Sequence, residues 1–185
     1  SGMAGSGREQ ESPKADLECG LFHLQTMEPD LVLCGNHEDR LWRHLESKSY
    51  IVAEYAHDII GKVQAACKGM GSELVPYSGQ FQGVMMGPAL LTHGTIFNVN
   101  AARDMAETYG SNEVRFVIFG HTHTVAIGMA RAAHGCMGIN VGALTDRRAM
   151  EYAKNRRQTW AWVNACITGE YCDNDMVYQL HVLDQ

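Results

Sequence analysis

Three short apolar runs in the sequence each end at a glycine and a polar side chain. The run LVLC (31–34) precedes Gly-Asn-His, the run ALLT (89–92) precedes His-Gly, and the run RFVIF (115–119) precedes Gly-His-Thr-His. Apolar runs of this length, bounded by turn residues, predict short buried strands. Because ligands bind beyond the carboxyl ends of neighbouring strands in layered α/β sheets, we expect these polar groups to share one site.

Helical periodicity covers most of the sequence before and between these runs, and further short strands follow the last run. The predicted helices span residues 15–28, 37–47, 50–67 and 98–110. Two of the runs lie within longer predicted strands at 84–94, with an interruption at Gly87-Pro88, and at 114–123. Further strands are predicted at 138–144 and in a final hairpin from 159–167 and 176–183. This order of elements predicts an α/β fold of layered, mixed sheets, in which antiparallel strands gather toward the C-terminus.

Composition limits the class of protein. A chain of 185 residues predicts a single domain, placed at 15–185, after a tag-like or disordered leader at 1–14. No apolar run approaches the roughly 20 residues that cross a membrane. The net charge is −6 and no Lys/Arg cluster exceeds two residues, so nucleic acid is expected only as a possible substrate. The six cysteines form no C-x-x-C pattern and predict reduced thiols in a cytoplasmic protein.

The two histidines of the GHTH segment are a candidate metal site. Side chains two positions apart in an extended chain point to the same face, so His121 and His123 could address one point in space. Imidazole is the commonest metal ligand near neutral pH. The alternative is an exposed pair of histidines at a strand end, because matches to such a short motif have a high false-positive rate.

Taken together, the motifs resemble the calcineurin-like metallophosphoesterase superfamily. The matching segments are G-N-H-E at 35–38, T-H-G around His93, G-H-T-H at 120–123 and N-V-G-A-L at 140–144. Small phage and bacterial members in particular read G-N-H-E-x-R, and the resemblance runs from about residue 30 to the end. It implies an αββα-type sandwich and a hydrolase, a phosphatase or phosphodiesterase, that attacks a phosphomonoester or phosphodiester with metal-activated water.

The resemblance also implies a set of metal ligands. Asn36, His93 and His121 would ligate one ion, and His123 would ligate a second. Two-metal sites of this kind stabilise both the attacking and the leaving oxygen. Imidazole and amide ligands suit manganese, zinc, iron or nickel, so the metal is left open.

Three residues beside Asn36 receive roles in the chemistry from the same resemblance. His37 would donate a proton to the leaving alkoxide or hold the phosphate, with Glu38 as its orienting partner. Arg40 could hold a phosphate oxygen, and a solvated helix face is the alternative for it.

The sequence contains neither the D-x-H motif nor the G-D-x-x-D motif that precede G-N-H in the family. Without the bridging carboxylate, two ions held by neutral ligands would repel each other, so we expect one metal site. A non-catalytic metal- or phosphate-binding module of the same fold is therefore an alternative, and a plain α/β domain with incidental histidines is another. In the family, these two motifs follow strands inside a sheet, and the absence of those strands would leave open sheet edges. Open edges predict either a homo-oligomer or a shortened chain.

Overall fold

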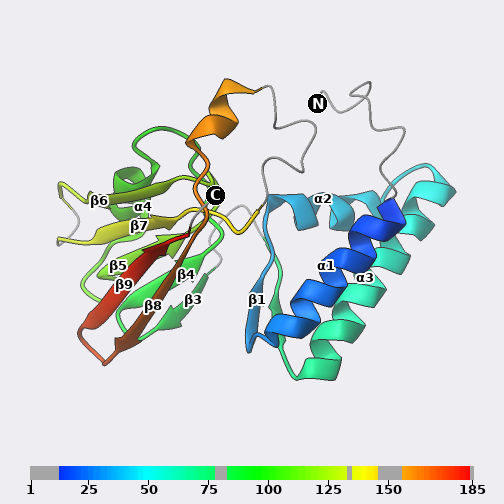
Figure 1. Cartoon of the computed structure of the whole chain (residues 1–185), viewed down its shortest axis with the longest axis horizontal. Helices are drawn as coiled ribbons and strands as arrows, with labels where there is room; N and C mark the ends of the chain where they lie inside the picture. The colour runs from blue at the N-terminus through cyan, green and yellow to red at the C-terminus, as the bar shows by residue number, and fades with distance from the viewer. Residues whose placement is uncertain (1–12, 78–82, 133–134, 146–155, 184–185) are drawn as a thin grey trace. The chain divides into compact units, whose positions relative to one another are not determined.

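The computed structural model describes residues 13–77, 83–132, 135–145 and 156–183. These residues form two compact units, 1–78 and 79–185, and each unit is described by itself (Figure 1). The predicted α/β fold class is confirmed, because helices and a mixed sheet occur together. Most of the predicted leader lies outside the described residues, and its last two residues, Pro13 and Lys14, begin the first helix.

The first unit combines three helices with a small parallel sheet. Strands β1 and β2 pair in parallel, with Leu31 opposite Glu73, and helices α1 and α3 lie side by side (Figure 1). Helix α3 ends at Met70 and is capped by Gly71, which adopts the left-handed backbone conformation (φ 77°) without a steric penalty. The elements are α1 (Pro13–Met27), β1 (Leu31–Leu33), α2 (Asn36–His44), α3 (Tyr50–Met70) and β2 (Glu73–Val75).

The second unit is built on a five-stranded mixed sheet in the order β3-β4-β5-β7-β6. Its three central strands, β4, β5 and β7, run parallel, and the outer strands β3 and β6 are antiparallel to their neighbours. A separate antiparallel hairpin, β8–β9, completes the unit. The elements are β3 (Gly83–Met86), β4 (Ala89–Thr92), α4 (Ala101–Tyr109), β5 (Phe116–Phe119), β6 (Val125–Met129), β7 (Met137–Val141), β8 (Ala165–Tyr171) and β9 (Met176–Val182).

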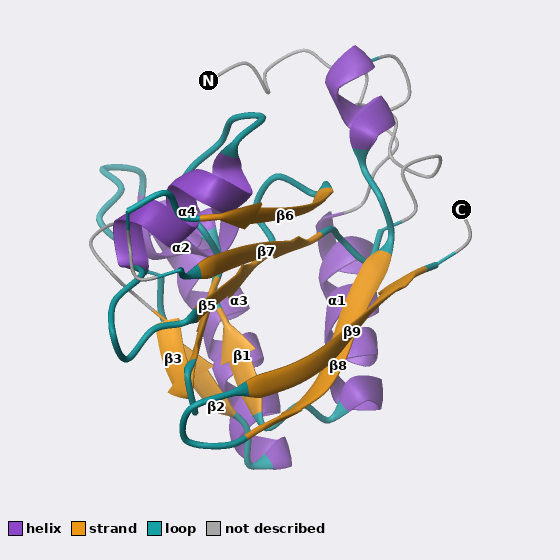
Figure 2. Cartoon of the chain, turned by 90° about the vertical axis from the view of Figure 1, so that its left-hand side faces the viewer, coloured by secondary structure: helices purple, strands orange, loops and turns teal. Residues whose placement is uncertain are grey.

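Both faces of the five-stranded sheet are covered. Alternate side chains of β5 point to opposite faces, as the strand period requires. Val117 and Phe119 pack with helix α4, whereas Phe116 and Ile118 pack with residues of the hairpin β8–β9. Figure 2 shows helix α4 and this hairpin on opposite sides of the five-stranded sheet. Helix α4 approaches β7 closely, because a Cβ atom at Gly138 would lie 1.8 Å from the carbonyl oxygen of Ala102. The unit is therefore layered as helix, sheet and second sheet.

Several predicted boundaries were wrong. The strand predicted at 114–123 ends at Phe119, so the GHTH segment is a turn rather than extended chain. The Gly87-Pro88 interruption is the turn of the β3–β4 hairpin. Residues 157–161, partly predicted as strand, form a short 3-10 helix, and the predicted final hairpin is confirmed with β8 running through Tyr171. Strand β6 was not predicted.

Among the residues that the structure describes, none of the helices has both the length and the apolar character required to cross a membrane.

Candidate functional site

The parallel strands of the second unit bring two predicted ligands to one edge of the sheet. Strand β4 ends at Thr92 immediately before His93, and the neighbouring strand β5 ends at Phe119 immediately before Gly120 and His121. The backbone N–H of Gly120 donates a hydrogen bond of 3.2 Å to the carbonyl of His93, which ties the two strand ends together. The predicted convergence of these two strand ends is confirmed.

The imidazole rings of His93 and His121 are in direct contact. Nε2 of His93 lies 3.1 Å from Nδ1 of His121, and the ring centroids are 5.0 Å apart at an interplanar angle of 73°. One nitrogen donates and the other accepts, according to the tautomer of each ring. Both residues are half-buried.

Gly94 allows the loop after β4 to pass close to His121. Its backbone is left-handed (φ 100°), and a Cβ atom there would lie 2.8 Å from the ring of Phe119 and 3.0 Å from Cβ of His121. A larger residue would push the loop away from the β5 end. The His-Gly order at 93–94 therefore has a local reason in the packing of the site.

The GHTH turn holds both of its histidines in a left-handed backbone conformation, with φ of 46° at His121 and 60° at His123. Residues other than glycine rarely adopt this region, and such strain clusters at functional sites. The premise that His121 and His123 project from one face of an extended strand is therefore wrong. Their rings also make different contacts, because His121 meets His93 while the ring of His123 lies against Trp162 with centroids 4.4 Å apart.

A buried hydrogen-bond network supports this turn. The side-chain amide of Asn140, on β7, donates to the hydroxyl oxygens of Thr122 and Thr124, and these two hydroxyls lie 2.8 Å apart. The backbone N–H of Val163 donates to the carbonyl of His123 at 2.9 Å. Fixed partners on both sides of the turn explain how the strained backbone is maintained.

The remaining predicted site residues belong to the first unit. Asn36 begins helix α2, and the carboxylate of Glu38 accepts a 2.7 Å hydrogen bond from the backbone N–H of Gly35, which caps the helix N-terminus. His37 and Arg40 are exposed on the same helix. The structure thus gives Glu38 a capping role, and the predicted roles of Asn36, His37 and Arg40 stay predictions from the motif.

The burial of Cys34 distinguishes it from these exposed groups. Burial, with further contributions from the carboxylate of Glu38 and from Cys67, raises the pKa of its thiol to about 11. A thiol that stays protonated near neutral pH is a poor nucleophile and a poor metal ligand. Cys34 therefore belongs to the core of the first unit rather than to a reactive site.

The histidine pair fits part of a metal site. Two nitrogens 3.1 Å apart could both lie about 2.1 Å from one ion, the usual Zn–N distance. Over the described ranges, however, no group of three or more His, Cys, Asp or Glu side chains is arranged to hold a metal. His93 and His121 can thus supply two ligands, and further ligands would come from other groups or from water.

Three residues around the histidines were missing from the predicted site. The ring of Phe97 lies 5.9 Å from that of His121, Trp162 packs on His123, and Asn140 holds the turn. Asn140 had a sequence signal, since a polar residue inside an apolar strand is usually buried with hydrogen-bond partners. The other two had none, because their proximity depends on the path of loops.

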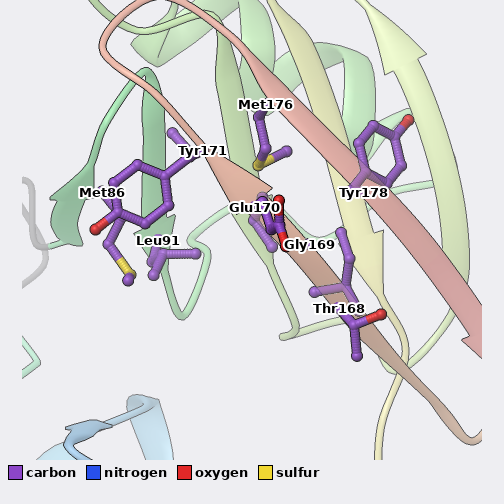
Figure 3. A pocket seen from close by; sticks show the side chains of 11 residues that line it. Met86, Leu91, Thr168, Gly169, Glu170, Tyr171, Met176 and Tyr178 are labelled. Carbon is purple, nitrogen blue, oxygen red and sulfur yellow. The ribbon is translucent and has the colours of Figure 1, made fainter.

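A second feature of this unit is an apolar cavity of about 280 Å³ between the five-stranded sheet and the β8–β9 hairpin. Met86, Leu91, Tyr171 and Met176 contribute to its lining (Figure 3). Histidine is not among the residues that line it, so this cavity is distinct from the His93–His121 pair.

Comparisons with protein family models, with curated proteins and with solved structures gave no match to this chain. The assignment of a function therefore depends on the motifs and on the geometry of the histidine pair.

Proposed function

We propose that this protein is a metal-dependent phosphoesterase that hydrolyses a phosphomonoester or phosphodiester. The observation that supports this best is the 3.1 Å separation of Nε2 of His93 and Nδ1 of His121 at the carboxyl edge of parallel strands. Both histidines stand in motifs that resemble the calcineurin-like superfamily. The left-handed backbone at His121 adds support, because strain of this kind is retained where the position has a function.

In this proposal His93 and His121 hold one divalent ion, which is manganese, zinc, iron or nickel. When bound, such an ion polarises a phosphoryl oxygen and acidifies a water molecule. The motif assigns Asn36 as a further ligand, and His123 as the ligand of a second ion if one binds. The roles of His37, as proton donor to the leaving alkoxide, and of Arg40, as a contact to a phosphate oxygen, rest on the motif alone.

Hydrolysis of p-nitrophenyl phosphate and of its bis-ester, with added manganese, tests the proposal. We expect His121→Ala and His93→Ala each to lower kcat/KM by about 100-fold or more, since each removes a ligand. His37→Ala is expected to act chiefly on esters with poor leaving groups, which need the proton most. The exposed His57 on helix α3 offers a matched control, His57→Ala, which should leave the rate unchanged. A rate of hydrolysis that is unchanged in His93→Ala and His121→Ala, and unchanged by a chelator, would refute the proposal.

A second candidate function is a non-catalytic module that binds a metal or a phosphate group. The small number of ligands gathered around His93 and His121 within the described residues favours it. Elemental analysis and calorimetry with Mn²⁺ or Zn²⁺ separate the two functions. One bound ion per chain, lost in His93→Ala, together with no hydrolysis of either ester would establish the module.

We further propose that the chain forms a homo-oligomer. Within the described part of the first unit, the β1–β2 sheet has two strands of three residues each, and each strand pairs on one side only. A second copy that pairs with this sheet would supply the missing strands. Light scattering that reports a monomer over a wide concentration range would contradict this.

The cysteines support a cytoplasmic location within the same proposal. All six are free thiols, and Cys166 and Cys172 lie on or directly beyond the same strand rather than in a bridge. Free thiols persist in reducing compartments. If the protein acts there, its hydrolytic rate should be the same with and without a reducing agent.

A further inference from the structure

Phe97 lies in the loop that joins strand β4 to helix α4, four residues after His93. Its side chain is 68% exposed, and its ring lies 5.9 Å from the ring of His121 at an interplanar angle of 83°. A large apolar side chain is thus presented to solvent directly beside the histidine pair. Nothing in the proposed hydrolytic roles uses it.

The loop around Phe97 is anchored on both sides. Before it, Ile96 packs against the core that α4 shares with the sheet, and the hydroxyl of Thr95 lies 3.2 Å from that of Tyr109. After it, the side chain of Asn98 accepts a 2.7 Å hydrogen bond from the backbone N–H of Asn100 and donates one of 3.1 Å to Asp104.

The carboxylate of Asp104 is itself fixed by its neighbours. Hydrogen bonds from Arg103 and then from Asn98 lower the pKa of Asp104, so it remains an acceptor through the physiological range. The exposure of Phe97 therefore follows from a held backbone and not from a loose loop.

A second apolar side chain is exposed at the same edge of the sheet. Leu144 follows the carboxyl end of β7 and is 64% exposed. Because β5 lies between β4 and β7, the loops that bear Phe97 and Leu144 follow the strands on either side of the one that leads to His121. An anion held at the histidine pair would thus have apolar groups on neighbouring strand ends.

We propose that Phe97 is a specificity-determining residue that recognises an aromatic ring on the alcohol side of the phosphate ester. The inference rests on the proposed function, because it takes the phosphoryl group to bind at His93 and His121. Contact between an aromatic ring and Phe97 removes apolar area of both from water, and aromatic pairs add an edge-to-face or stacked attraction. Aryl esters, or esters whose alcohol carries a planar base, are therefore the substrate class.

Binding of two non-hydrolysable probes, phenylphosphonate and methylphosphonate, tests the inference by calorimetry in the presence and absence of Mn²⁺. We expect the native protein to bind phenylphosphonate about tenfold more tightly, a ratio typical of one well-placed apolar contact. Phe97→Ala should reduce this ratio to near one by weakening phenylphosphonate alone. Val99→Ala is the matched control, since Val99 is 96% exposed in the same loop, and it should leave the ratio unchanged.

Each other outcome has a defined meaning. A ratio that persists in Phe97→Ala, or one near one in the native protein, overturns the inference. Equal weakening of both probes in Phe97→Ala would also overturn it, because Phe97 would then only position His121. A Phe97-dependent ratio without hydrolysis of any ester would refute the proposed enzyme and retain the recognition site. No binding of either probe refutes the inference, whatever the hydrolysis assay shows.

Discussion

The two units of the chain bury their apolar surface to very different degrees. In the second unit, helix α4 and the β8–β9 hairpin cover opposite faces of the sheet, and each interface has its own cluster of buried residues. In the first unit, no side chain of α1 from Lys14 to Met27 is buried, and Phe22 and Met27 are largely exposed. The second unit therefore has enough buried contacts to maintain a strained backbone conformation, whereas fewer buried contacts join helix α1 to the rest of the first unit.

The interior of the first unit shows the same contrast. Helix α1 directs Leu17, Leu21 and Leu24 toward β1 and α3. An open cavity of about 450 Å³ remains among these elements, larger than the 280 Å³ cavity of the second unit. Since fully buried side chains make the most contacts, and α1 has none from Lys14 to Met27, α1 is held by fewer contacts than α4.

Truncation of one core side chain in each unit should give the largest difference. Met105, on α4, is completely buried, so we expect Met105→Ala to lower the free energy of unfolding by about 2–5 kcal/mol. Leu21, on α1, is half-buried beside the open cavity, and Leu21→Ala should lower it by about 1 kcal/mol or less, because few contacts are lost. Denaturant unfolding of both variants measures the two losses. Equal losses would show that α1 is packed as tightly as α4.

Addition of a methyl group at Gly138 should have the next largest effect. The new Cβ atom would collide with the carbonyl of Ala102, so helix α4 must move away from β7. We expect Gly138→Ala to reduce the free energy of unfolding by about 1–3 kcal/mol, the usual range for overpacking. If thermal unfolding shows a smaller loss, α4 is free to shift and the second unit is less rigid than we infer.

The two units should respond alike to high pH, because each contains a buried thiol. Burial raises the pKa of Cys34 and of Cys136 to about 11 from 9.0. Between these values the thiols lose their protons in the unfolded chain and keep them in the folded chain. Stability that is complete below pH 9 should therefore fall as the pH rises to 11.

Denaturant unfolding from pH 8 to pH 11 measures this effect. Cys136→Ala and Cys34→Ala should each flatten the dependence relative to the native chain, whereas Cys19→Ala, at an exposed site, should not. Curves of unchanged slope in both buried-site variants would contradict the assigned pKa values.

The smallest effect is expected at Gly61, in the interior of helix α3. A Cβ atom there meets nothing within 4 Å, in contrast to the one at Gly138. Alanine has the higher helix propensity, so Gly61→Ala should raise the free energy of unfolding by about 0.5–1 kcal/mol. The same substitution would thus have opposite signs in the two units. Loss of stability at Gly61 would reveal a partner that packs on this face of α3.

Much of the framework was predictable from local pattern. The apolar runs at β1, β4 and β5 were short, continuous and bounded by glycine, and each is a strand in the structure. Parallel pairing of β4 with β5 then accounts for the contact between His93 and His121. These inferences succeeded because continuous apolar runs indicate buried strands, and because the carboxyl ends of neighbouring strands in layered α/β sheets gather polar groups at one edge.

Other parts of the site depended on tertiary context. The backbone at His121 and His123 is left-handed, a region that few residues other than glycine adopt, and buried partners such as Asn140 stabilise the turn. Strand β6 was missed because its side chains are half-buried or exposed and interrupted by Gly128. Phe97 reaches His121 through a loop whose path is set by Asn98 and Asp104. No periodicity or motif spacing in the sequence predicts these contacts.

The left-handed backbone at the histidines of the GHTH turn sets the stability of the fold against the role proposed for the imidazole ring. Glycine or asparagine would relax the backbone at position 121, worth roughly 1 kcal/mol, while removing the imidazole. In a library varied at this position, selection for heat resistance alone should enrich those two residues. Under the proposed function, selection for phosphate-ester turnover should restore histidine, and the divergence between the two pools would then report how much stability is given up to keep that ring.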